Sequence, residues 1–146
     1  MTLIVDAAPL VALADSQDPA RAAVRRVLAE EPGPLVVPAP VTAEVDYLLG
    51  RRHGPRARRA FLADLAAERF TVLCLGPEDH ALALEVDERH ADLQLGLADC
   101  SLVVAAHRRQ TSRVLSFDER DLRAVTPLSG GAFTLLPADA APIARG

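Results

Sequence analysis

Short apolar runs alternate along the chain with longer stretches of helical pattern. The runs predict buried strands at 2–5, 35–38, 70–75, 113–117 and 132–137. The stretches between them predict helices at about 9–15, 18–31, 40–52, 56–69, 77–90, 97–109 and 119–125. Strands that are apolar throughout need cover on both faces. The pattern therefore predicts a three-layer α/β/α domain with a central, mostly parallel sheet.

The length of 146 residues fits one compact domain. We place that domain at 1–137, and we expect 138–146 to form a loose tail because this segment has little to pack against. A domain of this size buries enough surface to fold without disulfides or a structural metal. A bound metal would therefore serve function.

All 16 residues counted as lysine or arginine are arginines. The absence of lysine excludes P-loop nucleotide binding, protein-kinase chemistry and Schiff-base or pyridoxal catalysis, each of which needs a lysine amine. The formal charge is -4, so any attraction to nucleic acid must come from local basic patches.

Neither cysteine lies in a CxxC pair or near a histidine at metal-ligand spacing, and we expect Cys74 and Cys100 to be reduced thiols in the core. The N-terminus lacks a basic region followed by a long apolar one, and no apolar stretch approaches about 18 residues. We therefore expect a cytoplasmic protein with no membrane segment.

Two predicted strands end in aspartate, at Asp6 and Asp118. In open α/β sheets, binding sites form beyond the carboxyl ends of the strands, so both carboxylates lie where a site is expected. The alternative for each is a helix N-cap.

Two further carboxylates fall on apolar faces of predicted helices. Glu44 shares a helical arc with Val41 and Val45, and Asp99 lies one turn before Leu102 and Val103 on the same face. A buried carboxylate is costly unless it is paired, protonated or bound to a cation. The structural alternatives are an N-cap for Asp99 and a hydrogen bond to a neighbouring arginine for Glu44.

All four acids can converge at the carboxyl edge of one sheet. At an effective dielectric near 20, two unit charges 4 Å apart repel by ~4 kcal/mol, and a divalent cation removes that penalty. A ligand set made only of oxygen atoms suits Mg²⁺ or Mn²⁺ better than zinc.

Four segments in order then give the chain a specific resemblance. They are IVDAAPLVALAD, VVPAPVTAEVDYLL, ADLQLGLADCSLVVAAHR and RVLSFDERDLRAV. Together they resemble PIN-domain ribonucleases of the VapC toxin type over about residues 2–136. The resemblance implies a metal-dependent endoribonuclease and places the catalytic and metal-binding acids at Asp6, Glu44, Asp99 and Asp118.

The family also implies chemistry and partners. One or two Mg²⁺ or Mn²⁺ ions would activate water for attack on a phosphodiester of a structured RNA, either tRNA or rRNA. A VapB-like antitoxin and a homodimer are implied as well. Asp121 is a possible accessory ligand, although we favour the alternative of a solvated helix position.

One departure from the family pattern favours a rival function. Family members commonly carry threonine or serine within two positions after the first aspartate, where this chain has Ala7 and Ala8. The rival is a PIN fold that only binds RNA or a partner protein. Dehalogenase-type phosphatases and response-regulator receivers are excluded because they need a lysine.

Arginines gather after the predicted glutamate helix. Arg51, Arg52 and Arg56 are the candidate RNA-binding residues, because guanidinium groups bind phosphates. The alternative is a solvated helix face.

Overall fold

The computed structural model describes residues 1–142, and its centre is a five-stranded sheet of order β3-β2-β1-β4-β5. All four strand pairings are parallel. The strands are β1 (Leu3–Val5), β2 (Leu35–Pro38), β3 (Thr71–Leu73), β4 (Arg113–Leu115) and β5 (Thr134–Leu136). The α/β prediction with a mostly parallel sheet is confirmed, and the order adds which strands are neighbours.

The helices connect these strands in the order that the sequence predicts. They are α1 (Ala7–Leu13), α2 (Arg21–Glu30), α3 (Ala39–His53), α4 (Pro55–Ala66), α5 (Pro77–Arg89), α6 (Gly96–Arg108) and α7 (Glu119–Ala124). A short 3₁₀ helix, Ala91–Leu93, was not predicted. Within residues 1–142 no helix is both long enough and apolar enough to cross a membrane.

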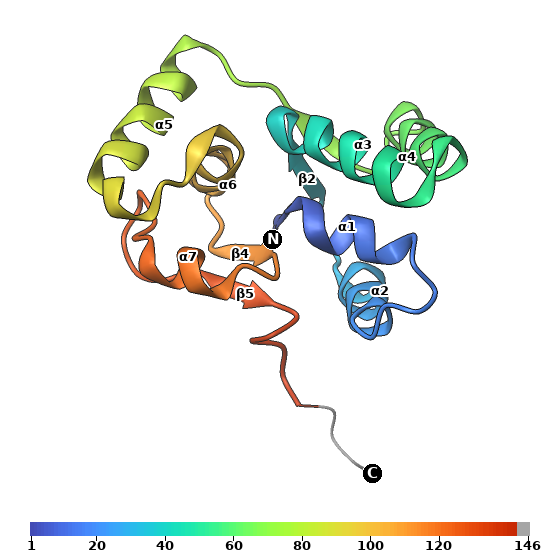
Figure 1. The fold of residues 1–146 in the computed structure, drawn as a ribbon. Helices are drawn as coiled ribbons and strands as arrows, with labels where there is room; N and C mark the ends of the chain where they lie inside the picture. Colours follow the sequence, from blue (N-terminus) through green and yellow to red (C-terminus); the bar gives the residue numbers. More distant parts are fainter. Residues whose placement is uncertain (143–146) are drawn as a thin grey trace.

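The strand order fixes which face each helix covers. The chain moves from β1 to β2 to β3 in one direction, then crosses to β4 and β5 on the other side of β1. Right-handed crossovers therefore place α1–α4 on one face and α5–α7 on the other, as Figure 1 shows. The switch in direction lies between β1 and β4, where a crevice at the carboxyl ends of the strands is expected to bind ligands.

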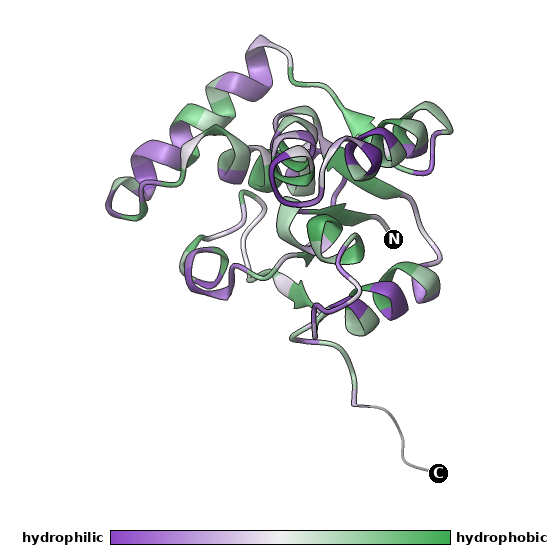
Figure 2. Ribbon diagram, turned by 45° about the vertical axis from the view of Figure 1, so that its right-hand side comes forward, coloured by the Kyte–Doolittle hydropathy of each residue, from purple (hydrophilic) through white to green (hydrophobic). Residues whose placement is uncertain are grey.

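The core lies between the sheet and these two helical layers. All three residues of β1 are fully buried, and so are six apolar residues of α6, namely Cys100 and the five residues Leu102–Ala106. Figure 2 shows the same division: the strands are mostly hydrophobic, and the hydrophilic residues are concentrated in the surrounding helices and loops. The expectation that both cysteines are buried is wrong for Cys74, which is exposed in the loop after β3.

Two boundaries differ from the sequence prediction. Helix α1 begins at Ala7 rather than Pro9, because the Asp6 carboxylate caps it and proline is tolerated in a first helical turn. The segment expected to be loose is tied at its start: the Asp139 carboxylate accepts hydrogen bonds from the Leu135 amide and from Arg123. Residues 143–146 of that segment lie outside the described part of the chain.

Candidate metal centre

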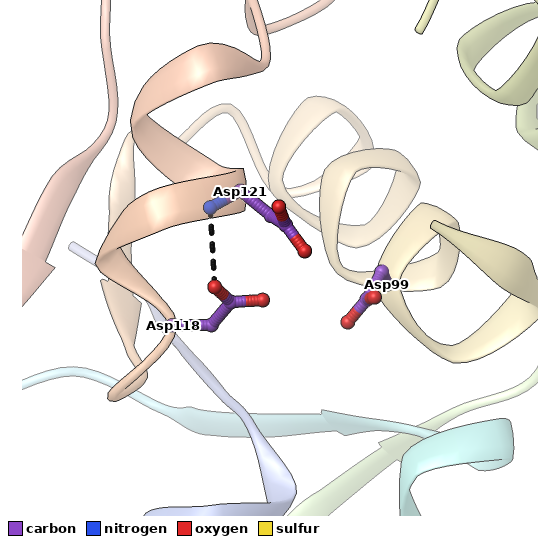
Figure 3. Close-up of side chains that lie close together, drawn as sticks. All are labelled: Asp99, Asp118 and Asp121. Atoms are coloured by element: carbon purple, nitrogen blue, oxygen red, sulfur yellow. Dashed lines mark hydrogen bonds between the residues drawn. The ribbon is translucent and has the colours of Figure 1, made fainter. Parts of the chain in front are cut away.

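Three carboxylates meet beside the switch point of the sheet. One oxygen from each of Asp99, Asp118 and Asp121 lies within 4.8 Å of the others. Figure 3 shows the three side chains converging on one space, with Asp99 on α6 and the other two at the start of α7. Asp118 is the N-cap of α7, and its Oδ1 accepts a hydrogen bond of 3.1 Å from the Asp121 amide. This bond fixes the two α7 acids relative to each other.

A buried hydroxyl connects Asp6 to this group. Ser116 Oγ donates to Asp6 Oδ2 at 2.7 Å and accepts from the Asp118 amide at 3.1 Å. The other carboxylate oxygen of Asp6 accepts from the Ala7 amide at 2.7 Å. Asp6 is therefore oriented by two donors, and Ser116 sets its position relative to Asp118.

Glu44 differs from the sequence prediction. Val41, Val45 and Leu49 form the buried stripe of α3, whereas Glu44 lies at the border of that stripe and is exposed. The prediction of a core-facing glutamate is wrong, because a position about 100° from the centre of a buried stripe reaches solvent. Partial burial, followed by the nearby charge of Asp6, raises the pKa of Glu44.

The structural alternatives for the two helical acids do not hold. Leu95 is the N-cap of α6 and no side chain caps that helix, so Asp99 is not an N-cap. Glu44 has no arginine partner in the part of the chain that the structure describes. Asp118 is both an N-cap and a member of the carboxylate trio, and Asp6 is an N-cap that Ser116 links to Asp118, so the two roles coexist.

Burial, together with neighbouring negative charge, raises the pKa values of Asp99 and Asp6. Burial, followed by the charges of Asp6, Asp118, Glu44 and Asp121, raises the pKa of Asp99 to about 7. Burial also raises the pKa of Asp6, although the Ser116 and Ala7 hydrogen bonds oppose this effect. Within residues 1–142 none of these acids forms a salt bridge. The cluster therefore has an unbalanced negative charge.

This donor set fits a hard divalent cation. The candidate ligand atoms are all carboxylate oxygens, the atoms that Mg²⁺ and Mn²⁺ prefer. A cation would also neutralise the repulsion that raises the pKa of Asp99. Asp121, which the sequence suggested only as an accessory ligand, is one of the three acids whose carboxylate oxygens lie closest together. Asp6 and Glu44 lie around this trio.

The candidate RNA-binding arginines occupy two different places. Arg51, in the last turn of α3, lies seven residues after Glu44 and thus on the same helical face. Arg56, in the first turn of α4, lines a cavity of about 490 Å³ with Leu10, Leu49 and Phe61. Arg51, Arg52 and Arg56 are all exposed and form no ion pair among the described residues.

Sequence reasoning missed Ser116. It lies two positions before Asp118 in the run RVLSF, where the other residues after Arg113 are apolar, and it is 1% exposed. A polar residue inside an otherwise apolar strand run is a signal that could have identified it, because buried hydroxyls need partners.

Comparisons with known proteins agree with this geometry. The PIN domain family model matches residues 3–126. Ribonuclease VapC26 of Mycobacterium tuberculosis is 34% identical over 135 residues, which cover 92% of this chain and all of the relative.

Two solved structures share the fold. Mycobacterium tuberculosis VapC20, described as a toxin that cleaves the sarcin-ricin loop, superposes with a TM-score of 0.74 at 23% identity, covering 81% of this chain and 91% of its own. Rickettsia felis VapBC2, bound to a DNA fragment from its promoter, gives a TM-score of 0.68 at 12% identity, covering 92% and 98%. The chain belongs to the PIN domain family, in its VapC ribonuclease branch.

Proposed function

We propose that this protein is a toxin endoribonuclease that hydrolyses RNA phosphodiester bonds with Mg²⁺ or Mn²⁺. The observation that carries the proposal is the carboxylate trio Asp99, Asp118 and Asp121, which lies beside Asp6 without a balancing arginine among the described residues. A raised carboxyl pKa such as that of Asp99 is frequent at functional sites.

Each acid has a role in this proposal. Asp6, Asp99 and Asp118 hold the cation, Asp121 adds a fourth carboxylate, and the exposed Glu44 orients water or substrate at the rim. When bound, the cation lowers the pKa of a water for in-line attack and stabilises the charge that develops on the phosphate. Asp99 must lose its proton to act as a ligand, so binding is expected to weaken as the pH falls below 7.

Ser116 answers the concern raised by Ala7 and Ala8. The missing hydroxyl after Asp6 would have oriented a carboxylate, and Ser116 Oγ already donates to Asp6 Oδ2. This hydrogen bond favours the enzyme over the alternative of a PIN fold that only binds RNA or protein.

Arg51, Arg52 and Arg56 are proposed to hold the RNA backbone. They are exposed and unpaired in the described chain, and guanidinium-phosphate contacts do not depend on base sequence. Replacing all three with glutamine should weaken RNA binding and flatten the slope of log affinity against log salt by ~0.7 for each lost contact with single strands. An unchanged salt slope would assign these arginines to a solvated helix face.

The partners follow from relatives. We propose a VapB-like antitoxin, because the Rickettsia felis relative is a VapBC complex. An arginine of such a partner would neutralise acids that no arginine of the described chain reaches, and the apolar cavity beside Arg56 offers a docking place. A homodimer, a cytoplasmic location, and tRNA or rRNA as the structured substrate complete the proposal.

Metal-dependent cleavage tests the proposal directly. A labelled structured RNA incubated with the protein should be cut in millimolar Mg²⁺ or Mn²⁺ and remain intact in excess EDTA. Mn²⁺ should also raise the melting temperature, because a ligand at 100 times its Kd stabilises the native state by ~2.7 kcal/mol. Equal cleavage in EDTA, or no cleavage with either metal, would contradict the proposal.

A further inference from the structure

The aromatic residues of this protein divide into a buried and an exposed group. Three of the five lie in the core: Phe61, Phe70 and Phe133 are each less than one tenth exposed. Phe117, in the turn after β4, is 37% exposed and adjoins Asp118. Tyr47 on α3 is 61% exposed, which is the highest value among the five.

Tyr47 lies next to Glu44 on the exposed surface of α3. It follows Glu44 by three residues, and side chains with that spacing are neighbours on a helix, about 5–6 Å apart at their Cβ atoms. Another flank of α3 is occupied by α4: Arg58 forms a 3.3 Å ion pair with Asp46, and its aliphatic part packs against Gly50. The ring of Tyr47 is therefore left open to solvent beside an acid of the site.

Arg51 completes a row along this side of the helix. It lies one turn beyond Tyr47 and about 10.5 Å along the axis from Glu44, within about 20° of the same direction. The row thus presents a carboxylate, an aromatic ring and a guanidinium group, in this order away from the metal centre. The carboxylate suits a bound cation, the aromatic ring suits a base, and the guanidinium group suits a phosphate. The base and the phosphate can belong to one nucleic-acid strand.

We propose that Tyr47 is a nucleobase-stacking subsite, which holds an unstacked base of a single-stranded RNA segment next to the phosphodiester that is cut. This assignment rests on the ribonuclease function proposed above. An exposed tyrosine ring contributes nothing to the core, and its hydroxyl has no hydrogen bond within residues 1–142. Base-aromatic stacking is a large gain that tolerates any base, because every base has a π-face. The subsite therefore selects RNA that can splay out a base, such as a loop, over a regular duplex.

The test measures binding and cleavage of short RNAs by Tyr47 variants. The probe is a mixed-sequence, single-stranded RNA of about 12 nucleotides that is long enough to span one such site. Its cut position is mapped with the parent protein. Binding is measured by fluorescence anisotropy in an Asp99→Asn background with Mg²⁺, so that the probe stays intact. Tyr47→Leu removes the ring, Tyr47→Phe keeps it, and Leu84→Ala removes an exposed apolar side chain from α5 as the matched control.

We expect Tyr47→Leu to weaken binding by about tenfold and to raise KM more than it lowers kcat, since one stacked base contributes on that scale. Tyr47→Phe and Leu84→Ala should bind as the parent does. A probe without a base at one position near the cut should lose the same affinity with the parent. With Tyr47→Leu the missing base should cause no further loss, because ring and base act as one pair.

Several results would overturn the assignment. Unchanged RNA binding by Tyr47→Leu would show that the ring holds no base. The same conclusion would follow if the affinity loss from Tyr47→Leu added to the loss from every abasic probe. In either case the ribonuclease function would stand. A changed oligomeric state of Tyr47→Leu in light scattering would assign the ring to an interface between two copies. A parent protein that cuts no RNA with either metal would overturn the ribonuclease function and the subsite together.

Discussion

Helix α7 carries acidic residues in two contrasting environments. At its start, Asp118 and Asp121 lie close to Asp99 in the candidate metal centre, without a basic partner in the described chain. Elsewhere on the same helix, Arg123 forms ion pairs with Glu119 at 2.8 Å and with Asp139 at 2.7 Å. The short helix α7 therefore borders two kinds of acid: acids without a basic partner, which we call unbalanced, and acids paired with Arg123, which we call balanced.

The pKa values of the two regions move in opposite directions. Burial and neighbouring carboxylates raise the pKa of Asp99 to about 7, whereas the Arg123 hydrogen bond and the Leu135 amide lower the pKa of Asp139. The charged form is thus disfavoured in the first region and favoured in the second. The balanced acids fasten the C-terminal turn to α7. The unbalanced acids cost folding free energy, which is expected where charge serves a ligand.

The largest expected effect is the loss of cleavage in Asp99→Asn. The substitution removes a proposed metal ligand and a proton-binding group while keeping the shape of the side chain. We expect kcat/KM for RNA cleavage to fall by at least about 100-fold, because removing even an indirect metal contact costs 10- to 100-fold. Initial rates on a labelled RNA in Mn²⁺ measure this change.

Asp92→Asn is the matched control, because Asp92 is an exposed aspartate in the 3₁₀ helix before α6. It should cut RNA at the parent rate. Parent-like cleavage by Asp99→Asn would remove the functional difference between the two acidic regions.

A smaller effect is expected from Ser116→Ala. This substitution leaves one oxygen of Asp6 and the amide of Asp118 without their hydroxyl partner. We expect cleavage to fall by about 10- to 100-fold and the free energy of unfolding to fall by about 1–3 kcal/mol. Rates and urea unfolding measure the two changes separately.

Ser101→Ala controls for the loss of a buried hydroxyl. Ser101 is fully buried on α6, and its hydroxyl donates only to the Ala98 carbonyl of its own helix. The variant should retain cleavage. If both serine variants lose activity in proportion to their stability, Ser116 acts on the fold rather than on Asp6.

The sequence predicted the sheet because strands have a local pattern, and local patterns also drew attention to acids that the structure brings close together. Apolar runs identified every strand, and strand ends located Asp6 and Asp118. The strand order was beyond these patterns, because it depends on which face each crossover covers. The order is what brings the two strand ends together at the switch point.

Distances within the site were also beyond the sequence. Helical periodicity placed Glu44 on the buried stripe, but the boundary of burial on α3 depends on how α4 and α6 pack against it. The close approach of Asp121 to Asp99 depends on how α7 is oriented, which is fixed by buried Leu122 and Val125. Tertiary packing, which has no local signature, decided both results.

The pH dependence of metal-free stability gives the smallest effect and compares the two regions in one measurement. The raised pKa of Asp99 means that the folded state binds a proton that the unfolded state releases near its ordinary pKa of about 4. Stability should therefore fall as the pH rises from about 4 to 7, then stay level.

Asp139, whose pKa is lowered, has the opposite sign, and its contribution should be lost only as the pH falls below about 4. We expect the stability difference between Asp99→Asn and the parent in EDTA to be smaller at pH 5 than at pH 8, because folded Asp99 still holds its proton at pH 5 and protonated aspartic acid resembles asparagine. At pH 8 the variant should be more stable by about 1 kcal/mol after allowance for solvent screening. Asp139→Asn should melt slightly lower than the parent at both pH values, because it loses its ion pair throughout this range. A constant difference between parent and Asp99→Asn from pH 5 to 8 would mean that the Asp99 carboxylate ionises as freely as the paired acids do.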